Sequence, residues 1–245
     1  DRTLSGQVRL ERQLPWGLKG YLGYQLQFDQ PSGVPGTVQS LFSQSQTQRF
    51  RTSLGFLGLR HDSTDDLLNP SRGGILTIHA DVAPGFFGSQ VEFVATRLEG
   101  RRFVNLWQKE VILAGRAVLG LMEPLGDTQE IPLFRRFFTG GYNTVRGYRL
   151  FILGPTDIAG NPVGGQSLLE ANAELRFPLY KELRGVAFVD AGNVYPTISD
   201  LNPGNLKYGA GFGVRYNTPI GPVGLDIAFP VNREQAKQDR VQVYF

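Results

Sequence analysis

Long segments in which apolar and polar residues alternate constrain this chain more than any other feature. In the first segment, Val8 and Leu10 fall on one side and Arg9 on the other. Residues 18–28 repeat the pattern, with leucines alternating with polar residues and glycine. A period of two is that of a β-strand, whose successive side chains point to opposite faces. The chain is therefore predicted to be all-β.

The same pattern recurs to the end of the chain and predicts about eleven strands. After the first two, strands are expected near residues 48–60, 75–83, 90–103, 110–122, 169–177, 184–194, 206–217, 223–231 and 240–245. Six apolar positions, one on each of six strands, are expected to face outward: Val8, Leu22, Leu113, Leu175, Val214 and Leu225.

Two architectures explain this alternation, a soluble β-sandwich and a transmembrane β-barrel. A tight turn is expected at Pro15-Trp16-Gly17 and a long polar loop at residues 30–46, an asymmetry typical of outer-membrane barrels. Strands of about ten residues, small residues on the apolar face and aromatics near strand ends also favour the barrel. We therefore predict an antiparallel transmembrane β-barrel of the outer-membrane type.

Composition excludes several classes of function. The chain has no cysteine, so it has neither disulfides nor thiolate metal sites. Its net charge of +3 comes from scattered basic residues, which argues against a nucleic-acid partner. No apolar run reaches the roughly 18 residues of a transmembrane helix.

Candidate catalytic and metal-binding residues are few. Asp62, Asp65 and Asp66 match no calcium-loop pattern, and we expect them in a solvated loop. The two histidines, His61 and His79, lack a metal-binding spacing. No G-x-S-x-G elbow is present. We expect no catalytic residue, no metal and no cofactor, and hence no enzyme.

Residues 140–148 form the least strand-like stretch between the predicted strands. Gly140, Gly141 and Gly147 allow left-handed backbone or close packing, while Val145 and Tyr148 flank a single cation, Arg146. A plain surface loop remains one interpretation. A loop with apolar residues around one arginine is also suited to folding back onto the protein.

The same stretch carries a family resemblance. Gly140-Gly141 followed by Val145-Arg146-Gly147-Tyr148 resembles the VRGF/Y loop signature of the BamA/TamA outer-membrane insertase superfamily, which includes two-partner secretion transporters. Four further stretches are similar to motifs of that family and occur in the same order: Asn69-Pro70-Ser71-Arg72-Gly73-Gly74, Gly164-Gly165 with Glu174-Leu175-Arg176-Phe177-Pro178, Phe188-Val189-Asp190-Ala191-Gly192, and Arg215–Pro222 with Asp226 and the terminal Phe245. The resemblance spans residues 62–245.

The resemblance implies a domain organisation. The chain (residues 1–245) would be the C-terminal portion of a 16-stranded barrel, whose first strands and periplasmic POTRA domains are not in this sequence. Residues 123–165 would be a long loop folded into the lumen. The first and last strands of such a barrel meet at a weak seam, and the expected seam strand carries Val241, Val243 and Phe245.

The resemblance also pairs the loop arginine with a carboxylate. Alternation places Asp190 on the inward face with Phe188 and Gly192, so an Arg146–Asp190 contact is expected. Glu170 and Glu174 are the competing partners. A second inward feature is the glycine series Gly209, Gly211 and Gly213, which we interpret as the footprint of the folded-in loop; a strongly curved strand is the alternative.

The implied function is assembly or translocation of other β-proteins in the outer membrane of a Gram-negative-type bacterium or a derived organelle. Unfolded client proteins and the lipid bilayer would be its partners, together with periplasmic or lipoprotein accessory subunits. The alternatives are a two-partner secretion pore for one exoprotein, a passive porin, and a membrane anchor for an upstream enzyme domain.

Overall fold

A single antiparallel sheet makes up the computed structural model, which describes residues 2–30, 35–39, 49–107, 110–218, 221–232 and 239–245. Within these residues eleven strands occur: β1 (Arg2–Gln13), β2 (Leu18–Gln30), β3 (Phe50–Asp62), β4 (Gly73–Ala83), β5 (Phe93–Trp107), β6 (Val111–Pro124), β7 (Ser167–Tyr180), β8 (Leu183–Tyr195), β9 (Lys207–Thr218), β10 (Gly221–Pro230) and β11 (Gln242–Tyr244). The all-β prediction and the number of strands are confirmed for the described residues.

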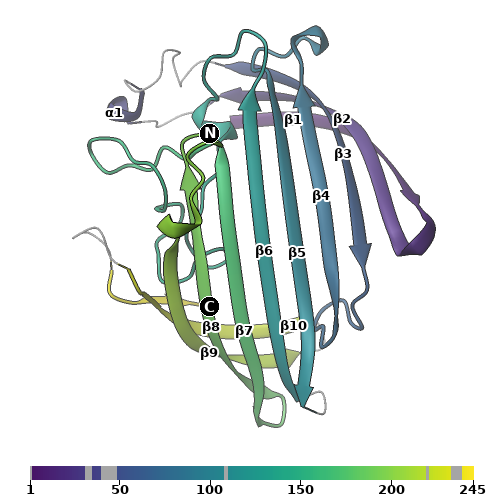
Figure 1. Ribbon diagram of the computed structural model, residues 1–245, viewed down its shortest axis with the longest axis vertical. Helices are drawn as coiled ribbons and strands as arrows, with labels where there is room; N and C mark the ends of the chain where they lie inside the picture. Colours follow the sequence, from purple (N-terminus) through teal and green to yellow (C-terminus); the bar gives the residue numbers. More distant parts are fainter. Residues whose placement is uncertain (1, 31–34, 40–48, 108–109, 219–220, 233–238) are drawn as a thin grey trace.

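Each strand pairs with its neighbours in sequence, from β1 to β11. Strands β4 to β7 run along the long axis of the molecule, whereas β9 and β10 cross the lower part of the view, so the sheet twists and curls (Figure 1). This curling is what a strongly right-twisted antiparallel sheet does as strands are added. It leaves β1 and β11 at the two ends of the sheet.

Strand boundaries differ from the predicted ones where connections compete for the backbone. The predicted strand at 90–103 is found at Phe93–Trp107, because Gln90, in the connection before it, donates its N–H to the Arg51 carbonyl of β3 instead of joining the ladder. The last strand is shorter than predicted, only Gln242–Tyr244. Of the predicted polar loop, residues 31–34 and 40–46 lie outside the described residues, and Gly36–Gln39 form a short helix, α1.

The turn between β1 and β2 forms as predicted at Pro15-Trp16-Gly17. Trp16 (φ 62°) and Gly17 (φ 72°) both take left-handed backbone, and the Leu14 N–H donates to Leu18 O to close the turn. Consecutive left-handed residues match the twist of a tight hairpin. The register of β1 on β2, Gln13 opposite Lys19, follows from this turn.

The two faces of the sheet differ in chemistry. Five of the six positions expected to face outward are exposed, and Leu175 is half-buried. The opposite face, which we call the inner face, carries the buried core. Its largest apolar cluster joins Leu54, Phe56 and Phe93 of the strands to Ile131, which lies in the segment between β6 and β7. That segment therefore lies on the inner face.

No helix within the described ranges is long and apolar enough to cross a bilayer.

Candidate functional site: the central loop and the carboxylates it contacts

Residues 125–166, here called the central loop, connect β6 to β7 and have a defined course. Isolated antiparallel bridges tie Phe137 to Gly165 and Thr139 to Leu153, so the loop doubles back on itself. Near its far end, Asp157 accepts a hydrogen bond from the Thr37 hydroxyl of α1 at 2.5 Å. Partial burial opposes ionisation of Asp157, but the hydrogen bonds from Thr37 and Asn161 lower its pKa to about 2.

The tip of the loop is buried against the strands that follow it. Val145 and Tyr148 are almost fully buried. Gly147 has a φ of 91°, and a Cβ there would lie 2.7 Å from the Phe229 carbonyl carbon of β10. Only glycine combines this left-handed backbone with so close an approach to another strand. The motif is thus shaped to place Arg146 against the sheet.

Arg146 forms a two-pronged contact with Asp190 of β8. Its Nε donates to Asp190 Oδ2 at 2.7 Å and its Nη2 to Oδ1 at 3.0 Å, while the Arg146 backbone N–H also donates to Oδ2 at 3.0 Å. Asp190 is completely buried and Arg146 is 7 % exposed. The fork geometry of a guanidinium matches a carboxylate in this way. The structure therefore brings together the two residues that the sequence paired.

Other charges surround this pair. Arg146 Nη1 donates to Glu174 and to Asp226, both at 3.1 Å. Arg146 therefore contacts Glu174 and Asp226 in addition to Asp190. Arg176 Nε also donates to Glu174, and Arg215 Nη2 donates to Asp226, each at 2.7 Å. Three arginines thus face three carboxylates. We call these six residues the Arg146 cluster.

This balance makes the burial of charge tolerable. An isolated buried ion costs several kcal/mol, and that cost is offset only when every charge has hydrogen-bonded partners of opposite sign. The Asn172 amide completes the set, since it donates to Asp190 Oδ1 at 2.9 Å and to the Thr144 carbonyl at 2.6 Å. Asn172 therefore ties the loop backbone to the same carboxylate.

An aromatic ring forms one wall of the cluster. The guanidinium carbon of Arg146 lies 3.4 Å from the centroid of the buried Phe188 ring. A cation over an aromatic face is attracted by the ring quadrupole, most of all where water is excluded. Phe188 thus packs against the flat face of the guanidinium, while Asp190, two residues along β8, accepts hydrogen bonds from its edge.

The predicted glycine footprint divides into two parts. At Gly209 an added Cβ would collide with the Arg146 carbonyl oxygen, so this position lies directly under the loop. At Gly211 it would meet the Phe188 ring, and at Gly213 it would meet Asp226. The latter two glycines leave room for residues that contact Arg146 rather than for the loop itself. Gly192 faces the loop too, at the Val145 side chain.

The remaining predicted residues lie elsewhere. Glu170 does not pair with Arg146: it accepts from the Thr139 hydroxyl at 2.6 Å and from Arg116 at 2.9 Å, nearer the base of the loop. Val241, Val243 and Phe245 are exposed at the end of the sheet, but only Val243 lies within β11.

Sequence reasoning missed five residues of this region. Arg176, Arg215 and Asp226 were noticed only as parts of motifs, although the alternation of Asp226 with Leu225 and Ile227 already placed it inward. Asn172 carried no signal beyond its inward position. Tyr244 points to the inner face of β11, whereas its neighbour Val243 points to the outer face. The Tyr244 hydroxyl contacts the central loop.

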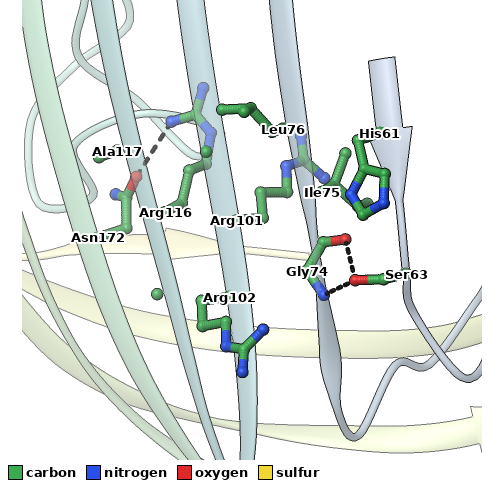
Figure 2. A pocket seen from close by; sticks show the side chains of 12 residues that line it. His61, Ser63, Gly74, Ile75, Leu76, Arg101, Arg102, Arg116, Ala117 and Asn172 are labelled. Carbon is green, nitrogen blue, oxygen red and sulfur yellow. Dashed lines mark hydrogen bonds between the residues drawn. The ribbon is translucent and has the colours of Figure 1, made fainter. Parts of the chain in front are cut away.

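A hollow lies beside the Arg146 cluster, lined by Arg101, Arg116 and Asn172 among others. Figure 2 shows Arg116 directed at Asn172, and Ser63 paired with the Gly74 backbone, which closes the turn before β4. Arg101 and Arg116 both contact Glu99, so these two cations of the hollow share one carboxylate.

The acidic residues that follow β3 accept hydrogen bonds within the connection between β3 and β4. Asp65 accepts from the Ser71 hydroxyl and from the backbone N–H groups of Ser71 and Arg72, and these hydrogen bonds hold the pKa of Asp65 well below its ordinary value. Among the described residues, no three His, Asp or Glu side chains group closely enough to hold a metal ion.

Known proteins are similar to this chain in sequence and in fold. The chain is 30 % identical over 221 residues to the outer membrane protein assembly factor BamA of Neisseria meningitidis serogroup B. The aligned region covers 77 % of this chain and 27 % of that relative. It is 30 % identical over 155 residues to a sorting and assembly machinery component 50 homolog of Xenopus tropicalis, covering 61 % of this chain and 31 % of that one. The chain thus spans less than a third of the length of these curated relatives.

A solved structure and a family model extend the likeness to nearly the whole chain. The crystal structure of BamA from Haemophilus ducreyi lacking POTRA domains 1–3 superposes with a TM-score of 0.82, covering 98 % of this chain and 53 % of that one. At 18 % identity this likeness concerns the fold. The model of the Omp85 superfamily domain matches residues 2–245. The chain belongs to the Omp85 superfamily.

Proposed function

We propose that this chain acts in the assembly of outer-membrane proteins, by offering the edge at the end of its sheet to unfolded β-strand clients. The relatives named as assembly factors or assembly machinery support the class of activity. Family membership places the chain in the outer membrane of a bacterium or of an organelle derived from one.

The observation that carries the proposal is the short pairing of the last strand. β11 pairs with β10 only at Asp226–Tyr244, Ile227–Val243 and Ala228–Gln242, whereas β1 and β2 pair along twelve residues. A strand edge presents N–H and C=O groups that an incoming strand can satisfy. A weakly held end strand is therefore the place where a client strand can be accommodated at the smallest cost.

The mechanism is template pairing followed by release. The client gains hydrogen bonds along the edge and buries apolar side chains in lipid as it folds. These gains drive the process, so no covalent chemistry, nucleotide or cofactor is required, and the protein acts without being an enzyme. The Arg146 cluster contributes by holding the central loop against β8 to β10, next to that edge. Periplasmic or lipoprotein accessory subunits would deliver the client.

Photo-crosslinking tests this proposal with a matched control. The full-length protein in lipid vesicles carries a photoreactive residue either at Val243 on the end strand or at Leu113 in the middle of the outer face; both positions are exposed. An unfolded barrel client is added and its folding is followed by heat-modifiable gel mobility. We expect faster client folding than in protein-free vesicles, and adducts at position 243 but not at 113. Equal adducts at both positions, or no acceleration, would overturn the proposal.

A further inference from the structure

The hydroxyl of Tyr244 joins the last strand to the central loop. It donates to the Tyr148 carbonyl at 3.0 Å and accepts from the Gly147 N–H at 3.1 Å. A phenol has one proton to give and can accept in return, so both contacts can form at once. One side-chain oxygen thus meets two consecutive backbone groups of the loop motif.

The ring of Tyr244 adds packing to these hydrogen bonds. It lies against a buried apolar cluster formed by Val186, Phe188 and Ala228, and its centroid is 5.7 Å from that of Tyr142 in the loop. Phe188 is the same ring on which the Arg146 guanidinium lies. In the β10–β11 ladder, Tyr244 stands opposite Asp226, another member of the Arg146 cluster. Tyr244 therefore contacts the cluster's surroundings through both its ring and its hydroxyl.

These contacts matter because the ladder that holds β11 is so short. Three residue pairs give few backbone hydrogen bonds, and a segment with few bonds opens at a small free energy. The contacts of Tyr244 are thus a large share of what keeps this strand in place. The loop is held independently elsewhere, since Gly147 abuts Phe229 and the Tyr148 hydroxyl lies 3.0 Å from the Asn232 carbonyl.

We infer that Tyr244 is a positioning residue that couples the central loop to the end strand, so that releasing the loop loosens the edge offered to a client. The significance of that edge rests on the proposed function, but the coupling itself does not. The hydroxyl is the coupling element on the inner face, because it is the atom shared by the strand and the loop backbone. The other link, from Arg149 to Asp239 and from Asp239 to Gln242 of β11, is exposed.

Hydrogen exchange of the full-length protein in lipid nanodiscs tests the coupling. Tyr244→Phe removes the hydroxyl and keeps the ring. We expect roughly tenfold faster exchange, the effect of losing about two net hydrogen bonds, in both the loop tip (residues 141–149) and the end strand (residues 242–245). Peptides from β4 to β6 should be unchanged. Tyr216→Phe on the exposed outer face of β9 makes the same chemical change away from the loop and should alter neither segment.

A disulfide separates coupling from simple loss of strand stability. Ile227→Cys with Val243→Cys joins positions that face each other in the β10–β11 ladder, and the chain has no other cysteine. In the Tyr244→Phe background this disulfide should slow exchange in the end strand while the loop tip stays fast. The inference is overturned if the loop tip never changes, if the disulfide restores it, or if Tyr216→Phe has the same effect.

Client assembly is measured with Tyr244→Phe and the unsubstituted protein, each carrying the photoreactive residue at position 243 and no disulfide. Tyr244→Phe should increase client crosslinking at position 243, because loss of the hydroxyl releases the edge more readily. If the unsubstituted protein assembles no client although the exchange results hold, the proposed function fails and the coupling stands. If clients are assembled but neither crosslinking nor loop exchange changes in Tyr244→Phe, the coupling is refuted and the proposed function stands.

Discussion

Arg146 and Arg149 lie three residues apart in the central loop. The guanidinium of each donates hydrogen bonds from two nitrogens to an aspartate, yet the surroundings of the two side chains differ. The Arg149 Nε and Nη2 donate to Asp239 at 2.9 and 3.0 Å, nearly the same geometry as Arg146 with Asp190. The side chain of Arg149 is 55 % exposed, whereas that of Arg146 is 8 % exposed. The two arginines therefore differ in burial and in the number of charged partners, since Arg146 also donates to Glu174 and Asp226.

Burial changes what each pair does for the protein. Water competes for exposed partners and screens their charges, so the Arg149 pair contributes little to stability. In the Arg146 cluster, removal of one charge leaves its partners buried without compensation. The lesson is that a bidentate geometry does not by itself identify the arginine that holds the loop.

Removing the buried arginine should have the largest effect. Arg146→Ala leaves Asp190 with the Asn172 amide and the backbone N–H of residue 146 but no cation. We expect the free energy of unfolding to fall by about 3–5 kcal/mol and the loop tip to detach. Urea unfolding in lipid vesicles and protease cleavage within residues 140–150 measure the two effects. Arg149→Ala is the control and should leave both nearly unchanged; an equal loss in the two variants would contradict the role of burial.

Replacing Arg146 by lysine, which keeps the charge but loses the planar guanidinium, should lower the free energy of unfolding by less. In Arg146→Lys a single ammonium group cannot reach both oxygens of Asp190 together with Glu174 and Asp226. We expect a loss of about 2–3 kcal/mol, the value of charged hydrogen bonds left unmade. The same unfolding assay measures it. If lysine proved equivalent to arginine, point charge alone would hold the loop.

Filling the space under the loop should displace it without touching any charge. Gly209→Ala would place a methyl group against the Arg146 carbonyl, and backbone on both sides leaves little room to adjust. We expect a loss of about 1–3 kcal/mol. Gly100→Ala is the matched control, since a Cβ there meets nothing within 4 Å. Similar stabilities for the two variants would show that the loop does not rest on Gly209.

The exposed pair should show itself mainly in titration. The hydrogen bond from Arg149 lowers the pKa of Asp239 below its ordinary 3.8. A lowered pKa in the folded state means that the pair contributes above pH 3.8 and that this contribution is lost as pH falls through the lower folded value. NMR titration of the Asp239 carboxyl group should show the lowered pKa in the unsubstituted protein and a higher pKa in Arg149→Ala, where only the Gln242 amide still donates to it. An unshifted Asp239 in both would mean that the pair does not form in solution.

Much of the fold could be predicted because the period of two is a local signal. Alternation gave the strands, and a turn residue pattern such as Pro15-Trp16-Gly17 gave the first hairpin. Ends of strands were less predictable, because connections such as the one containing Gln90 capture backbone groups through hydrogen bonds to distant residues. β11 is likewise shorter than the alternation predicts, since Val241 and Phe245 continue the pattern without joining the ladder.

The site was predictable only in part, for a related reason. Alternation places a side chain on a face but says nothing of its position across the sheet. It therefore placed Asp190, Glu170 and Glu174 inward together, and only the register of the strands separates Glu170 from Arg146. Asp226 and Tyr244 join the site because β10 pairs with β9 and β11 pairs with β10, which is a property of the whole sheet.

The most direct test of the account is a pair of double-mutant cycles in the unfolding assay. One cycle combines Arg146→Ala with Asp190→Ala, and the other combines Arg149→Ala with Asp239→Ala. Residues within one network show coupling energies of about 0.5–3 kcal/mol, whereas independent residues add. We expect coupling near the upper end of that range for the buried pair, with the double variant little worse than either single one, and no resolvable coupling for the exposed pair. Additive losses at Arg146 and Asp190 would contradict the account and would assign the loop arginine to Glu174 and Asp226 instead.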